Sequence, residues 1–171
     1  TARELRVELG CGKGRFTAGT AAAEPDVLFI AVEKVPDAMV VAMERARDAG
    51  LKNVFFVDGD AALLPDMFAP DEVDRIYINF CNPWPKKKHT NRRFVNPDNL
   101  KELARILKRG GLFRVATDHP IYKRHVLRIM HQCPDFQWIA KCGNDWKHEP
   151  KDWVRTKYQM KALREGRRPV W

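Results

Sequence analysis

The sequence contains no uninterrupted apolar run of the length that crosses a membrane, although 44% of its 171 residues are hydrophobic. A spanning helix needs about 20 such residues, so membrane-spanning proteins are excluded as a class and a cytoplasmic location is expected. No secretory signal or transit segment is visible in the sequence. Because it opens almost directly on a predicted strand, a natural N-terminal extension is expected to precede it.

Cysteine is scarce and shows no pairing pattern. The sequence has no C-x-x-C pair, and no cysteine stands at zinc-finger spacing from one of the five histidines. This pattern is typical of reduced thiols in a cytosolic protein, and no metal site is predicted. The four cysteines are Cys11, Cys81, Cys133 and Cys142.

Positive charge is scarce in the first half of the chain and abundant in the second. Residues 1–85 hold 9 Lys/Arg against 14 Asp/Glu, whereas residues 86–171 hold 22 against 8, within a net charge of +9 for the whole chain. A basic face can be a solvated surface without a partner. So large an excess in one half nevertheless favours a polyanionic partner, with nucleic acid as the leading candidate.

A glycine-rich turn separates the first predicted strand from the first predicted helix. The strand covers residues 5–9 and includes Glu8, and the helix covers residues 16–23. Glycine lets the backbone approach a ligand closely, and a helix start presents free N–H groups. Tight turns without a ligand can look the same, so this signal alone is weak. The three glycines of the turn are Gly10, Gly12 and Gly14.

The next two predicted strands, residues 27–32 and 53–57, also lead into acidic residues. Glu33 follows the second strand and stands 23 residues after Gly10. Nucleotide-binding βαβ units place an acid for the ribose hydroxyls at about this spacing. Asp60 follows the third strand, where it could accept from an adenine amino group or serve in ordinary turn chemistry. Glu33 could likewise be an exposed acid at a strand end.

The fourth predicted strand, residues 73–80, runs into the stretch Asn82-Pro83-Trp84-Pro85 and then into a block of five Lys/Arg and one His over residues 86–93. The prolines make this a rigid loop at the carboxyl end of a strand, where parallel sheets bind ligands. An indole can stack on a base, an amide can hydrogen-bond its edge, and lysines can hold phosphates. The alternative is a tryptophan that packs on prolines beside a solvated basic turn.

The rest of the chain continues the alternation of strands and helices. Such alternation predicts a doubly wound α/β sheet in one domain, residues 1–171. The residues after 153 alternate apolar and basic side chains, which predicts an antiparallel strand with one wet face. The remaining predicted elements are a helix from Pro36 to a stop at Gly50, a helix from Asn96 to a stop at Gly110, a strand over 112–117 ending at Asp118, a helix over 122–131, and strands over 136–139 and 154–162.

Polar residues thus follow four successive parallel strands, and this arrangement resembles the S-adenosylmethionine-dependent methyltransferase fold. Four motifs narrow the resemblance to the bacterial tRNA (guanine-N7-)-methyltransferase family, over nearly the whole chain. They are Glu8-Leu9-Gly10-Cys11-Gly12-Lys13-Gly14, Asn79-Phe80-Cys81-Asn82-Pro83-Trp84-Pro85-Lys86-Lys87-Lys88-His89, Thr117-Asp118 and Thr156-Lys157-Tyr158-Gln159.

The resemblance implies a seven-stranded Rossmann-like sheet, S-adenosylmethionine as cofactor, and methylation of N7 of a guanine in the tRNA variable loop. It implies Asn82 and Asp118 as catalytic residues. The family usually has Asp where this chain has Asn82, and Glu where it has Gln159. The implied cofactor residues are Glu8, Gly10, Gly12, Gly14, Glu33, Asp60, Ala61 and Asn82, and the implied guanine or RNA residues are Lys86, Asp118, Thr156, Lys157, Tyr158 and Gln159.

Two alternatives remain open at this point. Asn82-Pro83-Trp84-Pro85 also resembles the Asn-Pro-Pro-aromatic motif of enzymes that methylate exocyclic amines of nucleic-acid bases, although here the tryptophan precedes the second proline. The two departures from the family's acids would also suit an RNA-binding protein on a catalytically decayed methyltransferase fold. The oligomeric state, monomer or homodimer, is left open.

Overall fold

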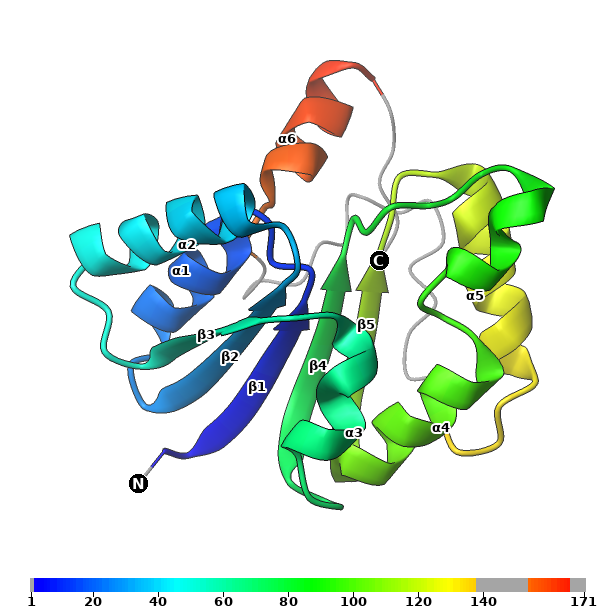
Figure 1. The fold of residues 1–171 in the computed structure, drawn as a ribbon, viewed down its shortest axis with the longest axis horizontal. Helices are drawn as coiled ribbons and strands as arrows, with labels where there is room; N and C mark the ends of the chain where they lie inside the picture. The colour runs from blue at the N-terminus through cyan, green and yellow to red at the C-terminus, as the bar shows by residue number, and fades with distance from the viewer. Residues whose placement is uncertain (1, 138–153, 167–171) are drawn as a thin grey trace.

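Five parallel strands form the sheet of the computed structural model, which describes residues 2–137 and 154–166 (Figure 1). The strand order is β3-β2-β1-β4-β5. From β1 the chain therefore adds β2 and β3 on one side, and then crosses back to add β4 and β5 on the other side of β1. This reversal between β1 and β4 is where open α/β sheets bind ligands. The strands are β1 (Glu4–Leu9), β2 (Val27–Glu33), β3 (Val54–Asp58), β4 (Val73–Asn79) and β5 (Leu107–Ala116).

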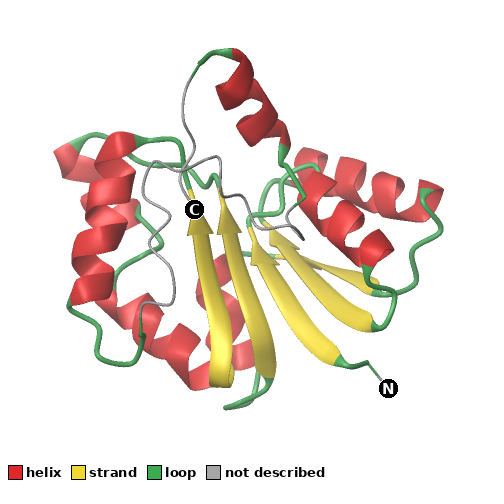
Figure 2. Ribbon diagram, turned by 180° about the vertical axis from the view of Figure 1, so that it is seen from behind, coloured by secondary structure: helices red, strands yellow, loops and turns green. Residues whose placement is uncertain are grey.

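Helices cover both faces of the sheet (Figure 2). On one face, Phe16 of α1 packs edge-on against Phe29 and Tyr77, with ring centroids 6.2 and 5.0 Å apart. Ala42 of α2 packs on the same side against Ala31 of β2. The long helices are α1 (Arg15–Ala23), α2 (Pro36–Asp48), α4 (Pro97–Ile106) and α5 (Pro120–His131).

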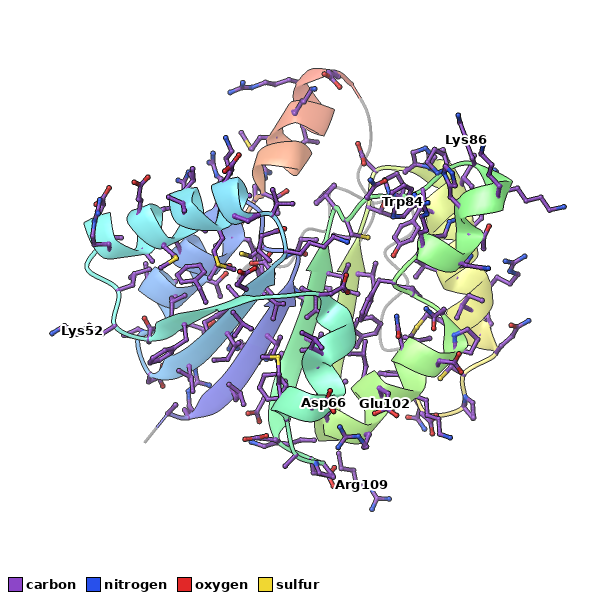
Figure 3. All side chains as sticks on the ribbon, viewed as in Figure 1. Lys52, Asp66, Trp84, Lys86, Glu102 and Arg109 are labelled. Atoms are coloured by element: carbon purple, nitrogen blue, oxygen red, sulfur yellow. The ribbon has the colours of Figure 1, made fainter. Side chains whose placement is uncertain are left out.

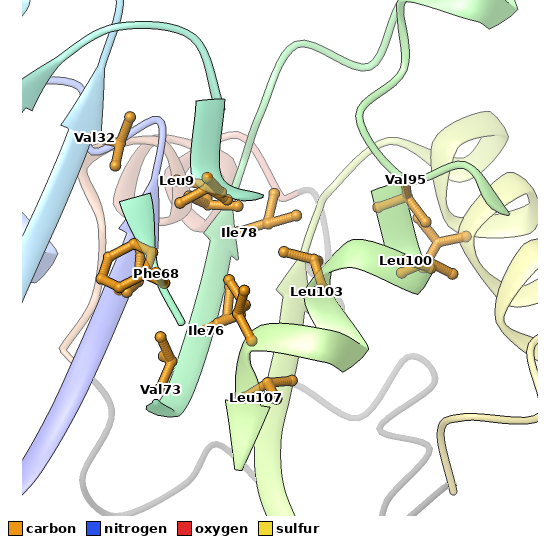
Figure 4. Packing of buried hydrophobic residues seen from close by; sticks show 14 of the residues in the cluster. Leu9, Val32, Phe68, Val73, Ile76, Ile78, Val95, Leu100, Leu103 and Leu107 are labelled. Carbon is orange, nitrogen blue, oxygen red and sulfur yellow. The ribbon is translucent and has the colours of Figure 1, made fainter. Parts of the chain in front are cut away.

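The larger core lies on the other face, between the sheet and helices α3 (Leu64–Met67), α4 and α5. Figure 4 shows Leu9, Ile76 and Ile78 of the central strands facing Leu103 of α4. Each of these four side chains is at most 3% exposed. Burial of such side chains stabilises the fold by about 1.5–3 kcal/mol each, so β1 and β4 form a firm base for the loops at their carboxyl ends.

Local sequence signals explain several element boundaries. Pro36 and Pro97 stand in the first turns of α2 and α4, where a missing N–H costs nothing. The side chain of Asn96 caps α4 by accepting from the backbone N of Asn99 at 2.9 Å. The predicted strands over 5–9, 27–32, 53–57 and 73–80 and the helices over 16–23 and 122–131 are confirmed to within two residues.

The helix predicted from Asn96 to a stop at Gly110 is too long, because it ends at Ile106. Strand β5 starts at Leu107, which pairs with Val73 of β4, and the Gly110-Gly111 pair lies inside this strand. The ladder shifts register between Val73 and Arg75. A Cβ on Gly111 would lie 2.8 Å from the carbonyl oxygen of Lys108 and 3.0 Å from that of Asp74. The glycine pair therefore allows a tight strand irregularity rather than a helix stop.

The predicted antiparallel strand over 154–162 is wrong, because Lys157–Arg164 forms helix α6. The backbone N of Met160 donates to the carbonyl oxygen of Thr156 at 3.1 Å, as in a helix. Val154 packs against the core on the α1 side. An alternating pattern over so few residues does not by itself separate a strand from a helix. The half-buried Val154 and the buried Thr156 both precede the helix.

Seven strands were implied, and the structure describes five. Residues 136 and 137 of the strand predicted over 136–139 are not in a strand, and its other two residues lie outside the described ranges. The prediction missed three short helical segments: η1 (Ala61–Leu63), α3 and η2 (Lys87–Arg92). Within residues 2–137 and 154–166, no helix has both the length and the apolar character needed to cross a membrane.

Candidate active site

The glycine turn, the second strand-end acid and the tryptophan loop all lie at the carboxyl edge of the sheet. Figure 3 shows Trp84 and Lys86 beyond the arrowheads of the strands, while Asp66, Glu102 and Arg109 lie at the opposite end. This edge follows from the parallel pairing, since β1, β2, β4 and β5 all point the same way.

The glycine turn has a backbone that other residues would adopt only with strain. Gly10, Gly12 and Gly14 have φ values of 73°, 55° and 68°. A Cβ on Gly14 would lie 2.6 Å from Cβ of Ala42, so this glycine lets α1 pack on α2. Apart from each glycine and its two chain neighbours, no heavy atom of the described residues lies within 4 Å of the Cβ position on Gly10 or Gly12. These two glycines therefore leave open space beside the turn, where a ligand could approach the backbone.

The Glu33 carboxylate organises this turn. Its Oε2 accepts from the backbone N of Gly12 at 2.8 Å, and its Oε1 accepts from the backbone N of Lys34 and of Val35, each at 2.9 Å. Glu33 is only 8% exposed. Three backbone donors occupy most of the roughly four acceptor positions of a carboxylate, which leaves a fixed acceptor position for one further donor.

Glu8 lies beneath the turn rather than at its surface. Its carboxyl group accepts from Oγ1 of Thr17 on α1 and, at 2.9 Å, from Nδ2 of Asn79 at the end of β4. Burial raises the pKa of Glu8 to about 7, and the two hydrogen bonds oppose the rise. Glu8 therefore joins β1, α1 and β4 at the point from which the glycine turn and the tryptophan loop start.

Asp60 and Ala61 lie at the start of η1, after β3. The Asp60 side chain is 57% exposed, and its Oδ2 lies 3.5 Å from Nζ of Lys34, beside Glu33. This ion pair is too exposed to contribute much to stability. The position does place a second acidic group at the carboxyl edge, next to the fixed Glu33 carboxylate.

The loop after β4 carries Asn82 and Trp84 on a strained backbone. Phe80 and Trp84 have φ values of 53° and 43°, in a region that costs non-glycine residues about 1–3 kcal/mol. The backbone N of Phe80 donates to the carbonyl oxygen of Ala116 on β5 at 2.8 Å. Oδ1 of the exposed Asn82 accepts from the backbone N of Trp84 at 3.2 Å. The Asn82 amide is thus oriented by its own loop.

Basic side chains surround the Trp84 ring. The guanidinium carbon of Arg92 lies 5.0 Å from the ring centroid, in cation–π geometry, and His89 meets the ring edge-on at 5.5 Å. Lys86 and Lys87, which lie between Trp84 and His89 in the sequence, are exposed. One ring face is therefore covered by Arg92, and base stacking on Trp84 would use the other face.

Asp118 stands two residues beyond the end of β5, next to the tryptophan loop. Asn79 pairs with Ala116 in the register of β4 and β5, so Asn82 and Asp118 follow neighbouring strands at the same edge. Oγ1 of the buried Thr117 accepts from the backbone N of His119 at 3.1 Å, which holds the turn that carries Asp118. The half-buried Asp118 is thereby placed on a defined turn.

The fourth motif lies at the start of α6. Thr156 is 8% exposed and precedes the helix, and Lys157, Tyr158 and Gln159 form its first turn. In Figure 1, α6 stands beyond the carboxyl ends of the strands. The motif is thus at the same end of the molecule as the glycine turn.

Sequence reasoning missed three residues that support the site: Thr17 and Asn79, which hold Glu8, and Arg93. Arg93 belongs to the basic block over residues 86–93, yet it is only 5% exposed. A signal existed in its neighbours, since the buried Val95 and the helix cap Asn96 follow it two and three residues later.

Within the described ranges, no group of three or more His, Cys, Asp or Glu is placed to hold a metal ion.

Comparisons with known proteins agree with this geometry. A family described as "Putative methyltransferase" matches residues 2–170. The chain is 39% identical over 169 residues to a tRNA (guanine-N(7)-)-methyltransferase from Zymomonas mobilis subsp. mobilis. This match covers 99% of the present chain and 73% of the relative. It is 40% identical over 167 residues to a protein of the same name from Ruegeria pomeroyi, with coverage of 98% and 70%.

A solved structure described as an antibiotic-related methyltransferase has the same fold. Its TM-score is 0.64 at 19% identity, over 99% of this chain and 87% of that one. The α/β architecture is therefore that of the Rossmann-like methyltransferases, and the sequence identities specify the group within it. The chain belongs to the tRNA (guanine-N(7)-)-methyltransferase family.

Proposed function

We propose that this protein transfers the methyl group of S-adenosylmethionine to N7 of a guanine in the variable loop of tRNA, in the cytoplasm, and that it does so as a single methyltransferase domain. The observation that carries the proposal is the 39% identity over 169 residues to a tRNA (guanine-N(7)-)-methyltransferase. The glycine turn, Glu33 and the tryptophan loop at one edge of the sheet support it.

The residues of the glycine turn fit S-adenosylmethionine. The space beside Gly10 and Gly12 is open, and Glu33 holds a fixed carboxylate at the end of β2 with one acceptor position left for a ribose hydroxyl. We assign to Asp60, an exposed acid at the same edge of the sheet, the role of accepting from the adenine amino group. When bound, S-adenosylmethionine supplies an electrophilic methyl group on a sulfonium centre.

Guanine N7 carries a lone pair and no proton, so the attack on the methyl group requires no general base. The protein must therefore hold N7, methyl carbon and sulfur in line, and alignment of this kind can be worth 7 kcal/mol or more. A neutral amide at Asn82 can do this by hydrogen bonds. Its replacement of the family's usual Asp thus leaves the chemistry possible.

We assign guanine recognition to Asp118. A carboxylate can accept both from N1–H and from the N2 amine of guanine, a pair of donors that adenine lacks. Asp118 follows β5 directly beside the loop with Asn82, so a base held by Asp118 would lie next to the Asn82 amide. The first turn of α6, with Lys157, Tyr158 and Gln159, adds RNA contacts in this proposal.

Loss of the Glu33 charge is expected to weaken cofactor binding. Glu33→Gln keeps the side chain's shape but turns an N–H₂ group toward backbone donors, so the affinity for S-adenosylmethionine should fall by about 2 kcal/mol, or roughly 30-fold. Isothermal calorimetry measures this directly. Glu102→Gln, at the opposite end of the molecule, is the control. Equal affinity of Glu33→Gln and the parent would remove Glu33 from the cofactor site.

The lysines after Trp84 are expected to hold tRNA phosphates. Neutralising Lys86, Lys87 and Lys88 together should reduce the slope of log K against log salt by up to about one unit per lysine and weaken binding to different tRNAs alike. The matched control neutralises Lys52, Lys101 and Arg109, three exposed cations outside the loop. If the control flattens the slope as much as the lysine variant does, net charge rather than this loop governs binding.

The reaction itself is tested by incubating the protein with methyl-labelled S-adenosylmethionine and unmodified tRNA, followed by nucleoside analysis. The proposal predicts label in 7-methylguanosine. Label in an N-methylated adenine or cytosine would favour exocyclic-amine methylation instead. Cofactor and tRNA binding without any labelled nucleoside would indicate an RNA-binding protein on a decayed fold.

A further inference from the structure

We propose that Arg93 is a positioning residue for methyl transfer, because its guanidinium group fixes the backbone of the loop that carries Asn82 and Trp84. The inference rests on the proposed function, since it assumes that this loop faces the reacting guanine. It assigns to Arg93 a role inside the protein instead of a phosphate contact.

Arg93 is turned inward and bonded to the loop backbone. Its Nε lies 3.2 Å from the carbonyl oxygens of both Pro83 and Trp84, and its Nη2 donates to the Trp84 carbonyl oxygen at 2.9 Å. The residue is 5% exposed, although residues 86–88 and 91–92 around it in sequence are exposed. A guanidinium presents several donors in one plane, so it can bridge two successive carbonyl groups.

These bonds act on Asn82 through Trp84. The carbonyl oxygen of Trp84 accepts from Arg93, while the backbone N of Trp84 donates to Oδ1 of Asn82 at 3.2 Å. Both ends of the Trp84 backbone are therefore held, at a residue whose φ is 43°. A strained backbone conformation persists only where surrounding contacts hold it in place. At Trp84, Arg93 provides one of these contacts as a charge-assisted hydrogen bond.

Arg93 is itself anchored to the helix layer. Its backbone N donates to the carbonyl oxygen of Thr90 at 3.0 Å, and its own carbonyl oxygen accepts from Nδ2 of Asn96, the cap of α4, at 3.3 Å. Two residues further, the carbonyl oxygen of the fully buried Val95 bonds to Nε2 of His125 on α5 at 2.7 Å. The guanidinium thus connects a strained loop to the packed helices.

A purely structural role for a buried arginine is the competing explanation, and the chain contains a matched case. Arg6 is 2% exposed and is held by Glu4 and Glu24, at 2.8 and 2.6 Å. It lies on β1, nearer the end of the sheet away from the loop. Arg6→Lys and Arg93→Lys both keep the positive charge and remove the several donors of a buried guanidinium group. The two variants differ mainly in the acceptors that lose a donor: carboxylates on Glu4 and Glu24 for Arg6, and loop carbonyl oxygens for Arg93.

The test is the single-turnover rate of 7-methylguanosine formation at saturating cofactor and tRNA, measured below the unfolding midpoints of all variants. Arg93→Lys should slow methyl transfer about 10- to 30-fold through lost alignment, with both binding constants within about 3-fold of the parent's. Arg6→Lys should lose stability but keep the parental rate. A parental rate in Arg93→Lys, or an equal slowing in Arg6→Lys, would overturn the inference.

A double-mutant cycle with Asn82→Ala checks the route of the effect. If Arg93 acts through Asn82, Arg93→Lys should slow the Asn82→Ala protein much less than it slows the parent. Full additivity would contradict that route. Should Arg93→Lys fail to fold, Arg93→Gln takes its place in both measurements. Failure of the parent to form 7-methylguanosine would instead contradict the proposed function.

Discussion

Asp118→Asn is expected to lower the rate of methyl transfer at least ~100-fold, equivalent to about 2.7 kcal/mol. The carboxylate can accept from two guanine donors, N1–H and the N2 amine. An amide has one acceptor and one N–H₂ group, so it must present a donor to a donor. Cofactor affinity should hardly change, because the proposed cofactor residues other than Asn82 lie on or directly after β1, β2 and β3, whereas Asp118 follows β5. Single-turnover rates with saturating tRNA measure the effect.

Asp48→Asn is the matched control, since Asp48 is 68% exposed at the end of α2 and pairs only with its neighbour Arg47 among the ion pairs described. It should leave the rate unchanged. A tRNA with inosine at the target position sharpens the test, because inosine lacks the N2 amine. The parent should discriminate against inosine more strongly than Asp118→Asn does. A parental rate for Asp118→Asn would remove Asp118 from guanine recognition.

Glu8→Gln is expected to stabilise the protein by about 3 kcal/mol at pH 8 and to be nearly neutral at pH 4.5. Burial raises the pKa of Glu8 from 4.5 to about 7. Between these values the folded state binds more protons at Glu8 than the unfolded state does. The contribution of Glu8 to stability is therefore complete below pH 4.5 and is lost as the pH rises through 7. Glutamine keeps the shape without a charge: its Oε1 can accept from Nδ2 of Asn79, and its Nε2 can donate to Oγ1 of Thr17, a hydroxyl that can also accept.

Urea unfolding of the parent and the variant from pH 4.5 to pH 8 gives the free-energy difference at each pH. Glu44→Gln, on the exposed side of α2, should show no comparable change over this range. A pH-independent difference between Glu8→Gln and the parent would contradict the raised pKa. The comparison needs no cofactor, so it tests the buried Glu8 cluster separately from catalysis.

The strand-end positions of the site could be read from the sequence because parallel strands impose a simple geometry. Glu33 follows an apolar run at a suitable distance from Gly10, and the carboxyl ends of such strands meet at one edge. The predicted strands before Glu33 and before the tryptophan loop are confirmed. The hydrogen-bond partners of Glu33 could not be predicted from the sequence, because all three are backbone N–H groups. Two belong to the residues that follow it, Lys34 and Val35, and the third belongs to Gly12 in the glycine turn.

The burial of Arg93 and the helical conformation of α6 were not predicted from the sequence. In a run of cations every member reads as exposed, but Arg93 is turned inward and donates to the carbonyl oxygen of Trp84, whose φ is positive. The alternation after Val154 fitted a strand, yet the contact of Val154 with Gly19 anchors the chain on α1 before the helix begins. Both outcomes depend on tertiary contacts, which override the local pattern of charge or alternation.

The most direct test of guanine N7 methylation uses two tRNAs that differ in one atom position. One carries guanosine at the variable-loop target, and the other carries 7-deazaguanosine, which has carbon in place of N7 and keeps the whole Watson–Crick edge. With methyl-labelled S-adenosylmethionine, we predict label in the first tRNA and none in the second, at equal binding of both. Equal labelling of the 7-deazaguanosine tRNA would contradict the account.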